Sequence, residues 1–236
     1  MKKFIYLLTL LRSPRRFFRG LTYLVNDEFY WDAYVKNWEM SSENRKFKYL
    51  GEEWGNQEVF VELLRKHSDR NASVLEIGCG GGKITAEAAP LFKHVSAADV
   101  SSEMLRKCKE AFGSAVSYHK LNGFTLTEFK DGSLDLVFSH DTFVHFSSLQ
   151  VYPYLTEIKR VLKDGGITVI SFYNFLRHFD LFKEMSMSFF RVKRYPPHMR
   201  VHFVTQEMIE RMASDLGMKV LEVERKNFLI FVIQKR

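Results

Sequence analysis

Short apolar runs alternate along this chain with stretches whose apolar residues recur at helical spacing. Residues 73–83 begin with an apolar run that is broken by glycines, and a helical pattern follows at once over residues 84–89. An order of strand, tight turn and helix is typical of a parallel sheet covered by helices on both faces. Four further runs predict strands of the same sheet, at residues 94–100, 116–119, 134–139 and 167–171.

The last part of the chain departs from this alternation. Residues 219–224 and 228–233 are both strand-like, and only a short turn separates them. Two strands joined in this way pair as an antiparallel hairpin, here at the sheet edge. The whole pattern therefore predicts an α/β fold, with a doubly wound, seven-stranded, mostly parallel sheet that ends in an antiparallel β-hairpin.

Helical patterns precede the first strand. Residues 58–66 form an ordinary amphipathic pattern, and residues 26–48 carry aromatic side chains at intervals of three and four, among them Tyr30, Trp31 and Tyr34. Such an aromatic stripe is more often the core of a helix packing than a ligand contact. Before it, an apolar run at residues 4–11 and a second pattern up to residue 25 predict two short amphipathic helices.

Composition is consistent with one domain, residues 26–236, preceded by a helical extension, residues 1–25. A hydrophobic content of 46% and an aromatic content of 15% argue against disorder. The apolar run at residues 4–11 is too short to span a membrane, and no small-residue cleavage site follows it. Cys79 and Cys108 offer neither a disulfide framework nor a clustered metal site, which predicts a reducing compartment and no metal.

The net charge of +7 is concentrated in the extension. Residues 1–20 hold six basic residues and no acid, so the remaining 29 bases and 28 acids nearly cancel. A basic stripe over the domain, as a nucleic-acid-binding protein would often show, is therefore absent. The basic amphipathic extension suits an anionic membrane surface, and it equally suits packing on its own domain or on a second subunit.

The glycine turn in residues 78–82 predicts a nucleotide site. Gly78 and Gly80 let the backbone approach a ligand closely, and the helix that follows presents unpaired N–H groups. Asp99 ends the next strand about 20 residues later, where an acid can accept both hydrogen bonds from a ribose diol. Lys83 stands where a dinucleotide site would prefer a third glycine, and Glu76 is better placed for a cationic ligand than for a pyrophosphate.

Residues 76–82 resemble the E/D-x-G-x-G-x-G loop of the class I S-adenosylmethionine-dependent methyltransferases, and Asp99 resembles their ribose-binding acid. Residues 134–139 and 160–166 are similar to the fourth strand and the turn before the fifth. The resemblance implies S-adenosylmethionine as cofactor and an N-terminal helix closing over it, with Tyr30, Trp31 and Tyr34 as candidates. The implied cofactor-binding residues are Glu76, Gly78, Cys79, Gly80, Asp99, Val100, Met104, Asn122, Gly123 and Ser139.

Two of these assignments leave an alternative open. Met104 can lie beside the adenine or pack into the sheet. Asn122 occupies a position where the family usually has an acid that receives the adenine amino group, and its amide oxygen can still accept that hydrogen bond.

His140 and His145 are the candidate catalytic residues. They follow the fourth strand, and ligands bind at the C-terminal ends of the strands in an open parallel sheet. Histidine is the natural base near neutral pH. His140 is the candidate for a substrate-facing base, whereas a structural cap or loop hydrogen bond is the favoured role of His145.

Residues 173–203 are long for a connection and predict a lid insertion. Basic residues outnumber acidic ones there, which favours an acceptor carrying phosphate or carboxylate, although a solvated basic surface explains the same composition. The expected function is methyl transfer to a small-molecule or lipid-linked, anionic acceptor, with O-methylation favoured, by a cytoplasmic protein peripherally associated with membrane. A non-catalytic cofactor-binding sensor and, more distantly, a nicotinamide oxidoreductase are the alternatives.

Overall fold

A computed structural model describes residues 27–52, 57–191 and 201–236 of the chain. The predicted extension at residues 1–25, and the part of the predicted lid at residues 192–200, lie outside the described residues. The division into an extension and one domain therefore stays a prediction.

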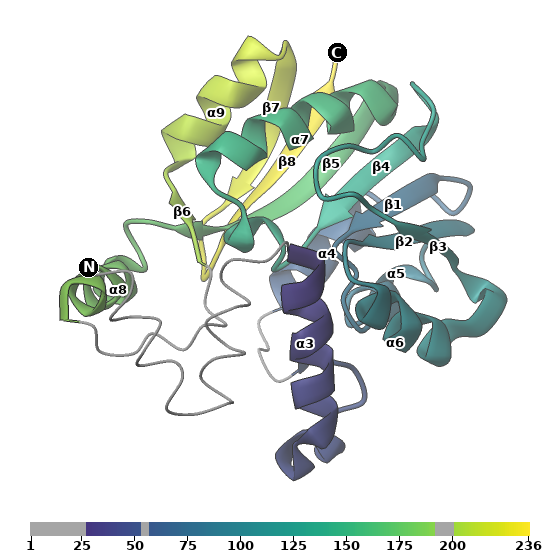
Figure 1. Cartoon of the computed structure of the whole chain (residues 1–236). Helices are drawn as coiled ribbons and strands as arrows, with labels where there is room; N and C mark the ends of the chain where they lie inside the picture. Colours follow the sequence, from purple (N-terminus) through teal and green to yellow (C-terminus); the bar gives the residue numbers. More distant parts are fainter. Residues whose placement is uncertain (1–26, 53–56, 192–200) are drawn as a thin grey trace.

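A central sheet organises the described residues (Figure 1). Its strands follow the order β3-β2-β1-β4-β5-β8-β7, and in this order β8 alone runs in the direction opposite to the other strands. The strands are β1 Ser73–Ile77, β2 His94–Asp99, β3 Ser117–Lys120, β4 Leu134–Ser139, β5 Leu162–Asn174, β7 Met218–Glu224 and β8 Leu229–Lys235. This arrangement confirms the predicted seven-stranded, doubly wound sheet with its antiparallel ending.

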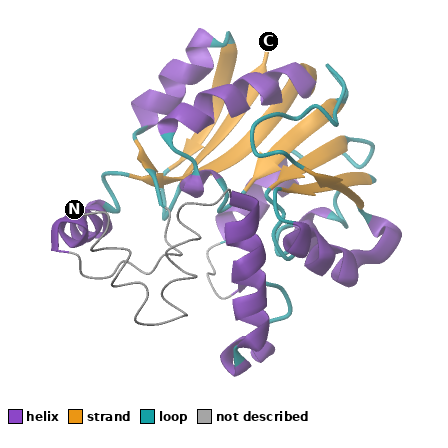
Figure 2. Ribbon diagram, in the orientation of Figure 1, coloured by secondary structure: helices purple, strands orange, loops and turns teal. Residues whose placement is uncertain are grey.

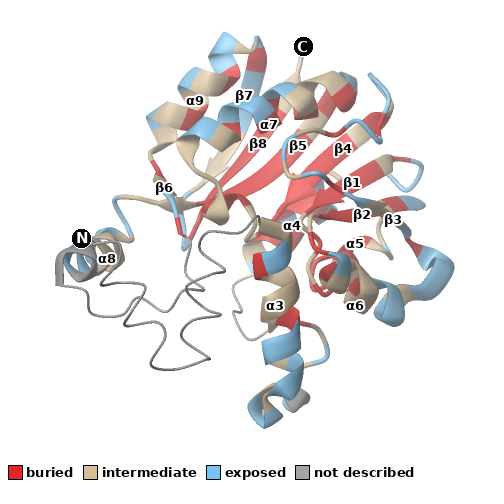
Figure 3. Ribbon diagram, in the orientation of Figure 1, coloured by how far each residue is buried: buried red, intermediate tan, exposed pale blue. Residues whose placement is uncertain are grey.

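Helices cover both faces of the sheet (Figure 2). Alternate strand residues turn to opposite faces, so Leu75 packs with the helices α7 and α9, whereas Val74 packs with α4, α5 and α6. The central strands are accordingly buried on both sides (Figure 3). These helices are α4 Glu58–Lys66, α5 Thr85–Ala88, α6 Ser102–Phe112, α7 Ser148–Val161 and α9 Gln206–Asp215.

The helix α3 Asp27–Met40 lies against α6 and covers the C-terminal ends of the first strands (Figure 1). Asp32 joins the two helices, because its Oδ1 accepts hydrogen bonds from the Ser101 hydroxyl at 2.6 Å and from the Glu103 backbone N–H at 3.1 Å. Lys120 adds an ion pair to Glu28 at 2.6 Å. The described residues also contain short 3₁₀ turns: η1 Ser42–Lys46, η3 Gly113–Ala115 and η4 Phe143–His145.

The predicted lid contains regular structure. Residues 173–174 are the end of β5, the helix α8 covers Phe179–Arg191, and the two-residue strand β6 Phe203–Val204 pairs with the end of β5. In the described part of the chain no helix combines the length and the apolar content needed to cross a bilayer.

Candidate functional site

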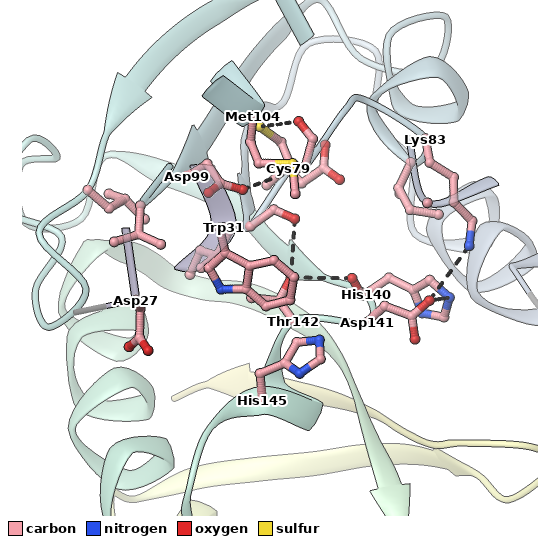
Figure 4. A pocket seen from close by; sticks show the side chains of 18 of the residues that line it. Asp27, Trp31, Cys79, Lys83, Asp99, Met104, His140, Asp141, Thr142 and His145 are labelled. Atoms are coloured by element: carbon pink, nitrogen blue, oxygen red, sulfur yellow. Dashed lines mark hydrogen bonds and ion pairs between the residues drawn. The ribbon is translucent and has the colours of Figure 1, made fainter. Parts of the chain in front are cut away.

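A cleft that is partly open to solvent lies at the C-terminal ends of β1, β2 and β4 and beneath α3. Open parallel sheets bind ligands at this edge, on either side of the point where the strand order reverses. Its walls come from the glycine turn after β1, from the residues after β2, β3 and β4, and from α3 (Figure 4).

The glycine turn forms one wall of the cleft. Gly78 and Gly80 have φ values of 73° and 53°, in the left-handed region that favours glycine. A Cβ atom on Gly78 would lie 2.2 Å from Thr142 Oγ1, whereas one on Gly80 would meet nothing nearer than the Met104 sulfur at 4.0 Å. The backbone at Gly80 is thus open to a ligand on one side.

Asp99 is held at the end of β2 by the same turn. Its Oδ2 accepts a hydrogen bond from the Gly80 N–H at 3.0 Å, and its Oδ1 accepts one from the Ser101 N–H at 2.8 Å. Burial raises the pKa of this carboxyl to about 6, although both hydrogen bonds act in the opposite direction. A carboxylate has about four acceptor positions, so two sugar hydroxyls can still donate to it.

Glu76 lines the cleft from β1 and is buried. Burial raises the pKa of its carboxyl well above the ordinary range, while the Thr85 hydroxyl, which donates to Oε2 at 2.6 Å, lowers it. A cationic group of a ligand would restore the charged form of this acid. Glu76 and Asp99 together fit a ligand with a ribose and an ammonium group.

Eight of the ten predicted cofactor residues line the cleft, namely Glu76, Gly78, Cys79, Gly80, Asp99, Val100, Met104 and Gly123. Two do not. The Ser139 hydroxyl is buried and donates to the Ile77 carbonyl at 2.7 Å. The Asn122 side chain is turned away, since its Oδ1 accepts from the N–H groups of Phe124 and Thr125, each at 2.8 Å.

The Asn122 amide oxygen is therefore engaged in closing its own turn, which corrects the expectation that it stands ready for the adenine amino group. Asparagine commonly caps its own turn in this way. Leu121 and Gly123, on either side of it, line the cleft instead.

The helix α3 contributes Asp27 and Trp31 to the opposite wall. The Trp31 ring meets the His145 ring edge-on, with centroids 4.8 Å apart and an interplanar angle of 64°. Of the three aromatic candidates, only Trp31 lines the cleft, while Tyr30 is buried and Tyr34 packs beside the cluster of Val35, Leu50 and Met104.

His140 lies at the inner end of the cleft, between the rings of Phe60 and Phe228 at centroid distances of 4.6 and 5.2 Å. Burial lowers the pKa of its imidazole to about 4, Asp141 acts to raise it, and Lys83 acts to lower it. Neither ring nitrogen has a hydrogen-bond partner among the described residues. His140 is thus neutral at pH 7 in the structure.

Asp141 lies near both Lys83 and His140 (Figure 4). Its Oδ2 lies 3.6 Å from Lys83 Nζ and 3.6 Å from His140 Nε2. Lys83 was singled out in the sequence only as a departure from the dinucleotide pattern. Asp141, with a φ of 60°, is the one described non-glycine residue in the left-handed region, and its N–H donates to the Ser171 hydroxyl at 3.0 Å.

Sequence reasoning missed other parts of the cleft. Asp27, Leu50, Thr142, Phe146 and Tyr154 all line it, and each comes from an element whose packing over the strand ends is set by tertiary contacts. Among the described residues, no group of three or more His, Cys, Asp or Glu side chains is arranged to hold a metal ion.

Comparison with known proteins gives the following matches. Residues 75–170 match the family described as methyltransferase domain. A probable S-adenosylmethionine-dependent methyltransferase, CRG1 of Saccharomyces cerevisiae, is 26% identical over 117 residues, which is 48% of this chain and 39% of that protein. A ubiquinone biosynthesis O-methyltransferase of Nitrosococcus oceani is 27% identical over 154 residues, which is 56% of this chain and 62% of that protein.

The chain thus spans less than two thirds of the length of these relatives. Among solved structures, magnesium protoporphyrin IX methyltransferase from Synechocystis, crystallised with bound S-adenosylhomocysteine, has a similar fold. The TM-score is 0.61 at 16% identity, covering 75% of this chain and 81% of that one. This likeness shows the shared fold.

Proposed function

We propose that this chain, which carries a class I S-adenosylmethionine-dependent methyltransferase domain, transfers the methyl group of S-adenosylmethionine to an oxygen atom of a small-molecule acceptor. The observation that carries the proposal is the buried Asp99 carboxylate, held against the open Gly80 backbone at the end of two parallel strands. A relative that shares 27% of its aligned residues is named as an O-methyltransferase, which supports oxygen as the methylated atom.

The chain's own residues have separable tasks in this reaction. Asp99 holds the ribose, Glu76 holds the ammonium group of the cofactor, and the apolar wall of Val100, Met104 and Leu121 encloses the adenine. When bound, S-adenosylmethionine supplies an electrophilic methyl group on its sulfonium. The protein contributes orientation and the exclusion of water, both of which the cover of α3 over the cleft provides.

The finer identity of the acceptor is also part of the proposal. We infer an anionic, lipid-linked or quinone-precursor acceptor, handled by a cytoplasmic protein at a membrane surface. The six basic residues within residues 1–20 support this inference, as does the exposed Lys183 on α8. For residues 1–25 and 192–200, this inference uses only their amino-acid sequence.

Two measurements test the proposal. Calorimetry should detect binding of S-adenosylhomocysteine and none of NAD, and Asp99→Ala should abolish that binding. Labelled S-adenosylmethionine, incubated with a lipid extract, should pass label to an acceptor. His140→Ala should lose transfer while it keeps S-adenosylhomocysteine binding, and the exposed His94→Ala should behave as wild type.

A cofactor-binding sensor is the second candidate function. The observation that favours it is the low pKa, about 4, to which burial brings His140, because a base of that strength is weak at neutral pH. Binding of S-adenosylhomocysteine without transfer to any fraction of the extract would support the sensor and reject the enzyme.

A further inference from the structure

Lys83 is the buried cation of the cleft. It is the one Lys or Arg among the described residues that line the cleft, and its side chain is 9% exposed. It directly follows the glycine turn, and its ammonium group reaches past the turn toward Asp141 and His140 (Figure 4). A buried ammonium is stabilised by a neighbouring acid, and Asp141 is an acid of the cleft that lies near Lys83.

Asp141 forms an ion pair with Lys83, but the pair is longer than a hydrogen bond. Charge-assisted hydrogen bonds are ordinarily about 2.7–2.9 Å long. The Asp141 Oδ2 atom is 3.6 Å from Lys83 Nζ and 3.6 Å from His140 Nε2, so it lies between two nitrogens without a close contact to either. An oxygen atom of a ligand can approach both Lys83 and Asp141 from the cleft.

The backbone at Asp141 is a second, independent indication. A φ of 60° lies in the left-handed region, which few non-glycine residues other than Asn and Asp adopt, and in this conformation the Asp141 N–H donates to Ser171 Oγ. Strained residues of this kind occur mainly at ligand sites, where the surrounding structure fixes a side chain in a required direction. Here that direction is toward Lys83.

We propose that Lys83 and Asp141 form the acceptor subsite and that the acceptor is an acidic hydroxyl, such as a phenol or an enol. The inference rests on the proposed transfer of methyl to oxygen. Lys83 Nζ donates a hydrogen bond to the acceptor oxygen, and the Asp141 carboxylate accepts one from the hydroxyl hydrogen. An ammonium group stabilises an oxyanion, so the subsite favours an acceptor whose oxygen carries negative charge as the methyl group is transferred.

The proton and electron pairs are accounted for as follows. The acceptor O–H bond breaks, the proton passes to the Asp141–His140 pair, and the oxygen keeps the bonding electrons beside Lys83. The new O–CH₃ bond forms as the S–CH₃ bond of the donor breaks, and that electron pair stays on sulfur. Asp141 and His140 return the proton to solvent through the open side of the cleft, and Lys83 stays protonated throughout.

Two probes that differ by one methyl group test the subsite. 4-Nitrophenol is yellow when ionised and colourless when neutral, and 4-nitroanisole carries the same ring with a methylated oxygen. With the protein saturated in S-adenosylhomocysteine, bound 4-nitrophenol should ionise about one pH unit lower than in solution, as expected beside a cation. Lys83→Met should abolish that shift and weaken 4-nitrophenol binding about tenfold, with no change for 4-nitroanisole.

Matched variants separate the subsite from general damage. Lys83→Arg should keep most of the shift, and the exposed Lys130→Met should be indistinguishable from wild type. Lys83→Met combined with Asp141→Asn removes both charges, so it should fold and bind S-adenosylhomocysteine but leave the 4-nitrophenol spectrum as in solution. An equal loss of both probes in Lys83→Met, or an unaltered 4-nitrophenol spectrum with the wild-type protein, would overturn the inference.

The two proposals fail in different ways. If the wild-type protein did not bind S-adenosylhomocysteine, the methyltransferase function itself would be rejected. Normal S-adenosylhomocysteine binding, with a 4-nitrophenol shift that persists in Lys83→Met, would reject only the acceptor subsite.

Discussion

Both the backbone conformation of Gly78 and the atoms around it disfavour a side chain at this position. Its φ of 73° is unfavourable for a residue with a side chain, and a Cβ would lie 2.2 Å from Thr142 Oγ1. We expect Gly78→Ala to reduce the free energy of unfolding by about 1–3 kcal/mol from overpacking, plus about 1 kcal/mol from the left-handed backbone.

Urea denaturation measures this loss, and Gly132→Ala is the matched control. Gly132 has a φ of 59° but nothing within 4 Å of an added Cβ, so it should show the backbone effect alone. Equal losses in the two variants would mean that Thr142 moves aside at no cost.

Asp99 predicts how cofactor affinity depends on pH. Burial raises the pKa of its carboxyl to about 6. In the proposed function, the ribose hydroxyls of the cofactor would donate to the ionised form. Binding therefore lowers this pKa, so the affinity for S-adenosylhomocysteine should increase as pH rises toward 6 and fall by about tenfold per unit below it. Calorimetry between pH 4.5 and about 7.5 measures the profile.

The raised pKa of Glu76 acts in the same direction, because its charged form is the one that would hold an ammonium group. Glu76→Gln should remove that contribution and leave the Asp99 step near pH 6. Asp99→Asn should bind weakly and without this step. A flat profile in the wild type would show that Asp99 does not hold the ligand.

Single residues differ in how far the sequence could predict them. The glycines and Asp99 belong to one continuous strand–turn–helix–strand unit. Their spacing in the sequence is therefore enough to predict that they lie close together. Lys83 and Asp141 meet only because β1 and β4 are neighbours in the sheet, and nothing near either residue indicates the other. The Asn122 side chain was misplaced because its own turn competes for the same oxygen.

At the scale of elements, Asp32 fastens α3 to α6. Its carboxylate accepts the Glu103 N–H at the start of α6 and the Ser101 hydroxyl, as a helix cap does, but from another helix. Asp32→Ala should lower the stability by about 1 kcal/mol. It should also speed hydrogen exchange in α3 more than in α7, and weaken S-adenosylhomocysteine binding through Trp31.

Asp180→Ala is the control for that variant, because the Asp180 side chain is fully exposed on α8. It should change neither exchange nor binding. If Asp32→Ala left the exchange of α3 unchanged, the aromatic contacts of Trp31 would be sufficient to hold the helix.

Element boundaries were predictable where a single pattern defined them. The helix at residues 58–66 and the strand at 134–139 match α4 and β4. The fifth strand was predicted over residues 167–171, yet β5 covers Leu162–Asn174. The early part of β5 pairs with β4 across an irregular register. Two consecutive glycines lie in that part, and from the sequence alone they indicate a turn instead of a strand.

At the scale of the whole molecule, the excess of positive charge lies in residues 1–20 and not in the rest of the chain. Residues 1–20 carry six bases without an acid, outside the described residues. We expect the full chain to bind anionic liposomes, with each base near the surface contributing about 1 kcal/mol. Deletion of residues 1–25 should release it, as a sedimentation assay would show.

Neutral liposomes and high salt are the controls, since salt screens exposed charges. Equal binding by the truncated chain would reject membrane binding as the role of this extension and would leave packing on the domain or on another subunit.

The position of β8 inside the sheet has a consequence for biosynthesis. It lies between β5 and β7, and its residues from Leu229 to Ile233 are buried. A nascent chain leaving the ribosome therefore exposes one edge of β5 until residues 229–233 have emerged, and an unpaired apolar edge favours aggregation. A chain whose synthesis stops before β8 would need chaperones to shield this edge, even though its glycine turn is already complete.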